Sequence, residues 1–333
     1  MADTRNADLV LEGGGVKGLG LLGAIVTLSE TGGLRFPRIA GASAGAIVGA
    51  LAAAQQRAGR PINELVEVME SLDYRKFADP TVLDRFGVLG KGLELLAHDG
   101  IYKGDFALRW ITEKLAAQGV HTWADLRIDD DPDTSLPPER RYRLVVVASD
   151  LSRGQLVRLP WDYHHYGLDA DEQSVALAVR ASMSYPFFFR PVTLRGAPGQ
   201  GECTLVDGGM LSNFPIEVFD RTDGQPPRWP TYGVKLSARR DARQVSRRVD
   251  GPVDLALAAL HTLLDAHDAY HLDDRHTEQR TVFVDTDKVS TLNFQIDTET
   301  QRWLYRSGQQ AATRFLGQLP PAGPARDAQL SGS

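Results

Sequence analysis

Twice within its first 56 residues, the chain passes from a short apolar segment through a glycine-containing turn into a helical pattern. Residues 7–11 lead through the glycine-rich residues 13–18 into a helical pattern over residues 19–30, and residues 38–42 lead into the almost uncharged residues 44–56. Short apolar segments are typical of buried parallel strands, and an uncharged apolar helix is normally buried against a sheet. This order of strand, helix, strand and helix predicts an α/β fold with a parallel sheet.

The rest of the chain extends this pattern. Further strands are expected at residues 142–148, 155–158, 203–206, 231–236 and 281–285, and helices at residues 61–72, 104–118, 174–181, 253–273 and 304–318. Three loop-like stretches are too short to separate domains: residues 129–138, 195–201 and 221–230. We therefore expect residues 1–319 to form one domain with a helical insertion at about residues 57–130, followed by a flexible tail at residues 320–333.

Composition removes several classes of protein. Cys203 is the single cysteine, so a scaffold held by internal disulfides is excluded. With 37 Lys and Arg against 43 Asp and Glu, the net charge is −6, which argues against nucleic acid as a partner. The most apolar stretches, residues 19–28 and 39–54, fall short of the ~20 apolar residues that a membrane span needs. Residues 1–8 do not resemble a Sec signal, so a cytoplasmic location is expected by default, with secretion by another route left open.

A G-x-S-x-G motif lies where the second predicted strand meets its helix, at Gly41, Ala42, Ser43, Ala44 and Gly45. The two glycines allow a sharp strand-to-helix turn that exposes the serine hydroxyl, and the helix N-terminus stabilises negative charge beside it. Ser43 is therefore a candidate nucleophile. The alternative is that small residues are present here only for packing of the helix on the strand.

The turn after the first predicted strand, Gly13-Gly14-Gly15-Val16-Lys17-Gly18, matches G-x-G-x-x-G. A dinucleotide-binding fingerprint needs an acidic residue at the end of the second strand, but Glu30 precedes that strand. A phosphate-binding P-loop needs Ser or Thr after Lys17, where Gly18 stands. A third interpretation is an oxyanion hole, because consecutive glycines let backbone N–H groups converge on one point. A plain tight turn is the simpler alternative.

A third motif, Asp207-Gly208-Gly209, ends the predicted strand at residues 203–206. A carboxylate at the end of a strand can reach into a neighbouring crevice. When this motif is taken alone, an ordinary Asp-Gly turn is the favoured explanation.

Taken together, these blocks resemble the patatin-like phospholipase family. Counterparts of the family's motifs occur in the same order at residues 12–18 (oxyanion loop), 41–45 (nucleophile elbow), 181–186 with Phe189 and Pro191 (A-S-x-S-x-P segment) and 207–209 (D-G-[A/G]). Residues 100–104 are also similar to bacterial members, and the resemblance covers residues 7–219.

The resemblance implies a three-layer α/β/α sandwich with a mostly parallel central sheet. It also implies a Ser-Asp dyad, in which Ser43 is the nucleophile and Asp207 is the general base that returns the proton to the leaving alcohol. The oxyanion hole is expected from the backbone of Gly13, Gly14 and Gly15. Further glycines of the motifs are expected to support the site: Gly18, Gly41, Gly45, Gly208 and Gly209.

Family members cleave acyl esters of phospholipids, galactolipids, lysolipids or neutral lipids. The expected partner is accordingly a lipid at a membrane or micelle surface, with no nucleic acid, cofactor or metal, and the need for an activator stays open. Glu12 stands where many members have Asp or another small polar residue, and we expect no loss of activity from this difference. Lys17 matches a basic residue that is common in the family, and it either contacts a lipid phosphate or is a solvated lysine at a helix start.

Several late histidines compete for a catalytic role. A Ser-His-Asp triad needs a histidine after the acid, and four follow Asp207: His261, His267, His271 and His276. Three of them fall in or near one predicted helix and none in an obvious strand-end loop. His267 and His271 have the spacing of a zinc-binding pair, but no third ligand is evident.

Two other groups have a structural and a functional interpretation. The arginines between residues 239 and 248 either contact anionic headgroups or lie in a solvated loop. Tyr185 and the three phenylalanines at residues 187–189 either line an acyl tunnel or pack in the core. Beyond lipid hydrolysis, the remaining functions are a general carboxylesterase for short acyl esters, a catalytically silent module that binds a membrane or a partner, and a nucleotide-binding protein.

Overall fold

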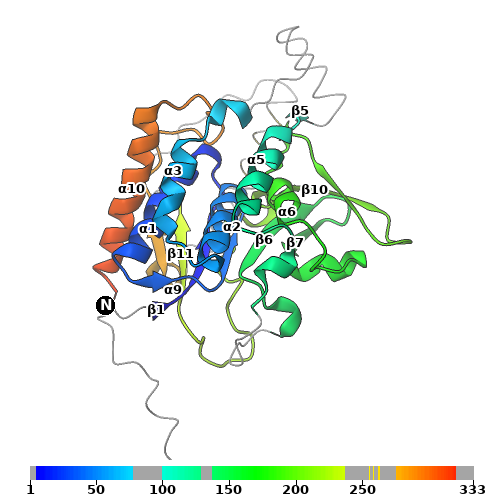
Figure 1. Cartoon of the computed structure of the whole chain (residues 1–333), viewed down its shortest axis with the longest axis horizontal. Coiled ribbons are helices and arrows are strands. Elements are labelled where there is room, and N and C mark those ends of the chain that lie inside the picture. The colour runs from blue at the N-terminus through cyan, green and yellow to red at the C-terminus, as the bar shows by residue number, and fades with distance from the viewer. Residues whose placement is uncertain are drawn as a thin grey trace, which may run out of the picture.

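The computed structural model describes residues 5–77, 100–128, 137–236 and 275–319, together with the single residues 255, 258 and 262. Its centre is an eight-stranded sheet with the strand order β12-β11-β2-β4-β6-β10-β9, and β7 pairs with β6 off this path (Figure 1). The strands are β2 (Asp8–Leu11), β4 (Ile39–Gly41), β6 (Leu144–Asp150), β7 (Gln155–Leu159), β9 (Val192–Arg195), β10 (Glu202–Asp207), β11 (Thr231–Lys235) and β12 (Thr281–Phe283). Two smaller sheets pair β1 (Arg5–Asn6) with β3 (Leu34–Arg35) and β5 (Gly100–Tyr102) with β8 (Phe187–Phe189).

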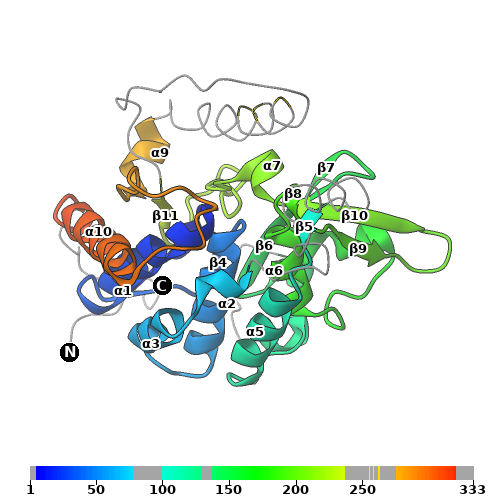
Figure 2. The same cartoon turned by 90° about the horizontal axis from the view of Figure 1, so that it is seen from above.

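Helices flank the sheet on both faces. The described α-helices are α1 (Gly18–Glu30), α2 (Ala44–Arg57), α3 (Leu65–Glu70), α5 (Asp105–Ala116), α6 (Val175–Ser182), α7 (Gly209–Ser212), α9 (Arg275–Gln279) and α10 (Thr298–Leu316). Seen from above, α1, α2, α5 and α10 lie on one side, and α7 and α9 lie on the other (Figure 2). This arrangement confirms the predicted α/β class with a mostly parallel central sheet between helices.

The five strands β12, β11, β2, β4 and β6 run parallel, whereas β7, β9 and β10 pair antiparallel to their neighbours. Gly41 at the end of β4 pairs with Val146 of β6, and Asp207 at the end of β10 pairs with Ala148, two residues further along β6. Ser43 lies two residues beyond Gly41. The register therefore brings Ser43 and Asp207 to the same level of the sheet.

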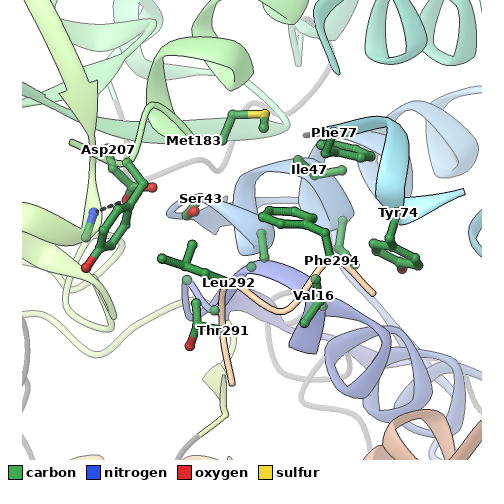
Figure 3. A pocket seen from close by; sticks show the side chains of 18 of the residues that line it. Val16, Ser43, Ile47, Tyr74, Phe77, Met183, Asp207, Thr291, Leu292 and Phe294 are labelled. Carbon is green, nitrogen blue, oxygen red and sulfur yellow. Dashed lines mark hydrogen bonds between the residues drawn. The ribbon is translucent and has the colours of Figure 1, made fainter. Parts of the chain in front are cut away.

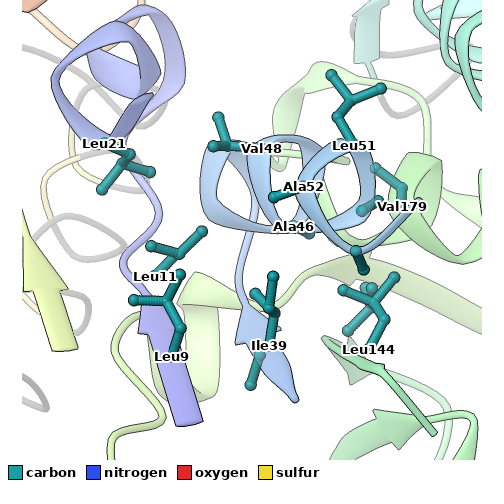
Figure 4. Packing of buried hydrophobic residues seen from close by; sticks show 14 of the residues in the cluster. Leu9, Leu11, Leu21, Ile39, Ala46, Val48, Leu51, Ala52, Leu144 and Val179 are labelled. Carbon is teal, nitrogen blue, oxygen red and sulfur yellow. The ribbon is translucent and has the colours of Figure 1, made fainter. Parts of the chain in front are cut away.

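Apolar side chains on one face of the sheet hold α1 and α2 in place. Leu9, Leu11 and Ile39 are fully buried beneath these two helices (Figure 4). Many alanines in α2 give this helix a thin side-chain layer, so it lies close to the strands that carry the motifs. The uncharged pattern of residues 44–56 is explained by this burial.

The C-terminal helix α10 packs along α1. Small residues allow the two backbones to touch, because a Cβ atom at Gly23 would lie 2.0 Å from the carbonyl oxygen of Tyr305 and one at Gly308 would lie 2.0 Å from that of Gly20. The helix begins six residues earlier than the apolar pattern predicts, at Thr298, because Asp297 caps it by accepting a hydrogen bond of 2.7 Å from the Thr300 N–H.

In the region predicted as a helical insertion, the described residues form α3 and α5 and the short 3-10 helices η2 (Ile62–Glu64), η3 (Tyr74–Phe77) and η5 (Trp123–Leu126). Most of the predicted helix at residues 253–273 and all of the tail at residues 320–333 lie outside the described residues. Within the described part of the chain, no helix combines the length and the apolar character needed to cross a membrane.

Candidate active site

Ser43 lies on the sharp turn between β4 and α2. Its φ of 50° and ψ of −117° are strained for a residue with a side chain. The Ser43 N–H donates a hydrogen bond of 2.9 Å to the hydroxyl oxygen of Ser182, at the end of α6. The strained turn, directly before the N-terminus of α2, presents the serine side chain to a cavity in the molecule.

The two glycines of the G-x-S-x-G motif are required by close backbone contacts. A Cβ atom at Gly41 would lie 2.4 Å from the carbonyl carbon of Gly45, and one at Gly45 would lie 2.3 Å from the carbonyl oxygen of Leu11. Any larger residue at either position would force β2, β4 and α2 apart. Gly41 and Gly45 thus support the turn without lining the cavity.

Asp207 faces this cavity from the end of β10 and is only 3% exposed. Its Oδ1 atom accepts a hydrogen bond of 2.8 Å from the Gly209 N–H, while Oδ2 has no hydrogen-bond partner among the described residues. Burial raises the pKa of Asp207 to about 7, against the lowering effects of the Gly209 N–H and of the Ser43 side chain nearby. Ser43 and Asp207 lie at the same end of the cavity (Figure 3).

One short segment, residues 182–184, holds the backbone on both sides of the site. The Ser184 carbonyl accepts a hydrogen bond of 3.0 Å from the Asp207 N–H, and the Ser182 carbonyl accepts one of 3.2 Å from Gly208. Together with the bond from Ser43, these contacts fix Ser43 and Asp207 to a common support. Gly208 is constrained as well, because a Cβ atom there would lie 2.2 Å from the Val147 carbonyl oxygen.

The glycine-rich loop lies beside Ser43, but its three N–H groups are not equivalent. Gly13 donates its N–H to the Asn213 carbonyl over 3.0 Å. Within the described chain, the N–H groups of Gly14 and Gly15 have no acceptor, and both residues line the cavity. Gly15 has a φ of +55°, and a Cβ atom there would lie 2.2 Å from the Thr291 carbonyl oxygen. The structure thus leaves two N–H groups of the loop available, not the three expected from the sequence.

Glu12 anchors the start of this loop. Its buried carboxylate forms an ion pair with the Lys235 ammonium group and accepts a hydrogen bond from the Leu236 N–H. Glu12 and Lys235 are 3% and 2% exposed, so the pair lies inside the protein. Glu12, which stands where many family members have Asp or another small polar residue, therefore ties the glycine-rich loop to the end of β11.

The cavity runs from its polar end, at Ser43 and Asp207, into an apolar interior (Figure 3). Most of its lining side chains are aliphatic or aromatic: Val16, Ile47, Val48, Met69, Leu72, Tyr74, Phe77, Met183, Tyr185, Phe189, Leu292 and Phe294. Tyr185 and Phe189 thus line the cavity, whereas Phe188 stacks on Phe294 with ring centroids 5.5 Å apart. The rings of this aromatic run are thus divided between the cavity wall and ring packing.

Other predicted residues take different places. Gly18 and Gly209 line the cavity, whereas Lys17 is not among the lining residues. No described histidine lines it, His276 included, and His261, His267, His271 and the arginines at residues 239–248 lie outside the described residues. Across the described ranges, no three His, Cys, Asp or Glu side chains cluster as metal ligands.

Sequence reasoning missed one whole segment of the site. Thr291, Leu292 and Phe294 lie between β12 and α10 and line the cavity opposite α2. The Thr291 carbonyl accepts a hydrogen bond of 3.2 Å from the Val16 N–H, which joins the segment to the glycine-rich loop. Asn213 was also missed. Neither the polar sequence around residue 291 nor an isolated asparagine carries a local signal for such a role.

Fold and cavity together fit a hydrolase built on an α/β sheet. The family model for patatin-like phospholipase matches residues 9–220. YqhO, an uncharacterized protein of Bacillus subtilis, is 35% identical over 315 residues, which cover 93% of this chain and 98% of YqhO. The chain belongs to the patatin-like phospholipase family and is a lipid acyl hydrolase.

The solved structure of VipD agrees on the fold. VipD from Legionella pneumophila is similar with a TM-score of 0.50 and 19% identity, over 93% of this chain and 66% of VipD. ExoU of the type III secretion system of Pseudomonas aeruginosa matches with a TM-score of 0.46 and 19% identity, over 94% of this chain and 53% of ExoU. This chain spans about two thirds of the first of these proteins and about half of the second.

Proposed function

We propose that this protein cleaves fatty-acyl esters of lipids through an acyl-enzyme on Ser43, with Asp207 as the general base. The observation that carries the proposal is the pairing of a strained Ser43 with a buried carboxylate whose Oδ2 atom has no hydrogen-bond partner among the described residues. A carboxylate with a pKa of about 7 is matched to proton transfer near neutral pH. No described histidine lies where it would compete for this role.

In the first step, the Ser43 Oγ atom forms a bond to the ester carbonyl carbon while its proton passes to Asp207. Collapse of the tetrahedral intermediate breaks the bond to the alcohol, which leaves with the proton from Asp207. In the second step, a water molecule loses a proton to Asp207 and attacks the acyl-enzyme. The proton then returns to Ser43 as the fatty acid departs.

The negative charge that develops on the carbonyl oxygen is stabilised by hydrogen-bond donors. The proposal assigns this role to the N–H groups of Gly14 and Gly15, with the N–H of Ala44 at the start of α2 as a third donor. Loss of one such donor typically costs about 3–4 kcal/mol in the transition state. Gly13 contributes by its bond to Asn213, which holds the loop in place.

The apolar lining of the cavity favours long acyl chains over short ones. Burial of each methylene contributes about 0.8 kcal/mol, so a long chain gains binding free energy that a short ester lacks. A lipid presented by a membrane or micelle is accordingly the proposed substrate. A short-chain esterase would have no use for the apolar lining between Ile47 and Phe294.

The test is fatty-acid release from phospholipid vesicles, measured beside hydrolysis of p-nitrophenyl esters of increasing chain length. Wild type should act on both, and Ser43→Ala and Asp207→Asn should each lose activity while keeping the circular dichroism spectrum of wild type. Ester cleavage without lipid cleavage would support the short-chain esterase instead. Retention of activity by folded Ser43→Ala would refute the proposal, and so would a folded wild type that is inactive on every substrate.

A further inference from the structure

The apolar cavity ends at a wall that it shares with a second cavity. Leu72, Tyr74 and Phe294 line both. Tyr74 lies at the end of the apolar cavity that is remote from Asp207, and the Phe294 ring lies between Ser43 and Tyr74 (Figure 3). An acyl chain that enters from Ser43 would therefore meet the Phe294 ring before it could reach Tyr74.

The second cavity is polar. Amide and hydroxyl side chains line it together with five charged ones: Glu70, Asp73, Arg75, Asp297 and Arg302. Asp73 and Arg75 form an ion pair of 2.8 Å, and Asp297 caps α10. Methylene groups that passed the wall would displace water from charged groups, so they would lose the gain that the apolar cavity gives them.

Phe294 is the best-held part of this wall. It stacks on Phe77 from η3, with centroids 6.1 Å apart and planes at 11°, and meets Phe188 and Phe189 of β8 at 5.5 Å and 6.2 Å. A ring fixed on several sides by other rings acts as a rigid stop rather than a yielding one. Tyr74 is the second ring of the wall and is itself 7% exposed.

The chain around Phe294, residues 291–296, is here called the capping segment. It is bonded to the glycine-rich loop through Val16 and Thr291 and continues directly into the capped N-terminus of α10. It also lies outside residues 9–220, which the family model matches. The part of the chain that closes the cavity is thus separate from the part that carries Ser43 and Asp207.

We propose that the capping segment determines acyl-chain length, with Phe294 as the stop at the end of the chain. This inference rests on the proposed function for its substrate class. Each methylene up to the stop raises kcat/KM about fourfold, the factor equivalent to burial of one CH₂ group, and further methylenes add nothing or lower it. Removal of the ring joins the two cavities and moves this limit to longer chains.

The first experiment measures kcat/KM on p-nitrophenyl esters from butyryl to stearoyl. Phe294→Ala should move the limit to longer chains and lower activity on the best wild-type ester several-fold. Phe294→Leu, which keeps an apolar side chain in place, should move it less. Ser149→Ala is the control, because Ser149 lines neither cavity and its hydroxyl has no hydrogen-bond partner in the described structure. It should leave the limit unchanged.

The second experiment separates this inference from the catalytic proposal. In a Ser43→Ala background, binding of free fatty acids of the same lengths is measured by calorimetry, below their micelle concentrations, with and without Phe294→Ala. If Phe294→Ala moves the chain-length limit for fatty-acid binding, the role of Phe294 as the stop is supported even if the esters are not cleaved. An unchanged length profile in folded Phe294→Ala and Phe294→Leu, in binding and in turnover, would overturn it.

Discussion

The N–H of Ser43 donates a hydrogen bond of 2.9 Å to the hydroxyl oxygen of Ser182, 139 positions later in the chain. The carbonyl groups of Ser182 and Ser184 accept hydrogen bonds from Gly208 and Asp207. A single turn at the end of α6 therefore supports the proposed nucleophile and the proposed base together. This relationship gives the A-S-x-S-x-P block a positioning role that its sequence alone does not reveal.

Ser182→Ala should lower kcat without a matching change in KM. The substitution leaves the half-buried Ser43 N–H without its acceptor, at a cost of about 1 kcal/mol, and frees a turn whose strained geometry depends on that bond. We expect kcat to fall about 10- to 100-fold, by comparison with the effect of small misplacements of reacting groups. Steady-state kinetics on a long-chain ester measures both constants.

Ser149→Ala is the matched control for this prediction. Ser149 is also a fully buried serine, in β6, but its hydroxyl has no hydrogen-bond partner in the described part of the chain. Its removal should leave kcat and KM within about twofold of wild type, since no bond is lost. Equal losses in the two variants would mean that Ser182 has no special positioning role.

The pH dependence of turnover should report Asp207. A general base must be deprotonated, and burial raises the pKa of this carboxyl to about 7. The value of kcat/KM should therefore rise as pH increases toward about 7 and level off above it. A neutral lipid substrate keeps substrate ionisation out of the profile. Activity that is already at its plateau near pH 5 would show that Asp207 is not the base.

Asp207→Asn should stabilise the protein at alkaline pH. The folded-state pKa lies above the ordinary 3.8, so the folded state binds the proton more tightly than the unfolded chain does. The stability linked to this proton is fully present below about pH 4 and is lost as pH rises through about 7. The total loss amounts to about 4 kcal/mol. Asn resembles the protonated form at every pH.

Thermal unfolding of both proteins checks this. The Tm of Asp207→Asn should exceed that of wild type at pH 8, and the two should converge near pH 4. A variant that is less stable than wild type at pH 8 would contradict the raised pKa. Together with the expected loss of turnover, a higher Tm would show that this carboxylate is kept at the expense of stability.

Much of the fold could be predicted from the sequence because its signals are local. The strands that end near Leu11 and Gly41 and the helix after Ser43 follow from short apolar runs and glycines, and the structure has them within one or two residues. The family match confirms the resemblance that rests on the same motifs. The roles of Ser43 and Asp207 remain predictions that the geometry supports.

Other parts of the site depend on contacts between distant segments. The Glu12–Lys235 ion pair joins residues 223 positions apart, and no local pattern marks Lys235 as its partner. Likewise, Phe294 reaches the cavity only because α10 folds back along α1. Tertiary contacts also decide which N–H groups of the glycine-rich loop are free, because the Gly13 N–H donates a hydrogen bond to the Asn213 carbonyl.

Gly45→Ala should destabilise the protein strongly, whereas Gly18→Ala should be tolerated. A Cβ atom at Gly45 would lie 2.3 Å from a backbone oxygen, while the nearest atom to one at Gly18 is the Ala44 Cβ at 3.5 Å. Overpacking of a close backbone contact costs about 1–3 kcal/mol or more, and a helical Gly to Ala change gains about 1 kcal/mol. Chemical denaturation compares the two variants. Similar stabilities would refute the steric account of the elbow.

Glu12→Gln should weaken both the fold and the glycine-rich loop. The substitution removes the charge that faces the buried Lys235 ammonium group, and loss of one partner of a buried pair typically costs about 3–5 kcal/mol. Since Glu12 directly precedes Gly13, turnover should fall in the fraction that stays folded. Thermal unfolding and kcat measured on the same samples test both effects. Glu12→Asp, with a shorter side chain, is the conservative comparison and should lose less stability than Glu12→Gln because it keeps the charge. If Glu12→Gln unfolds at the wild-type temperature with wild-type kcat, the ion pair does not hold the loop.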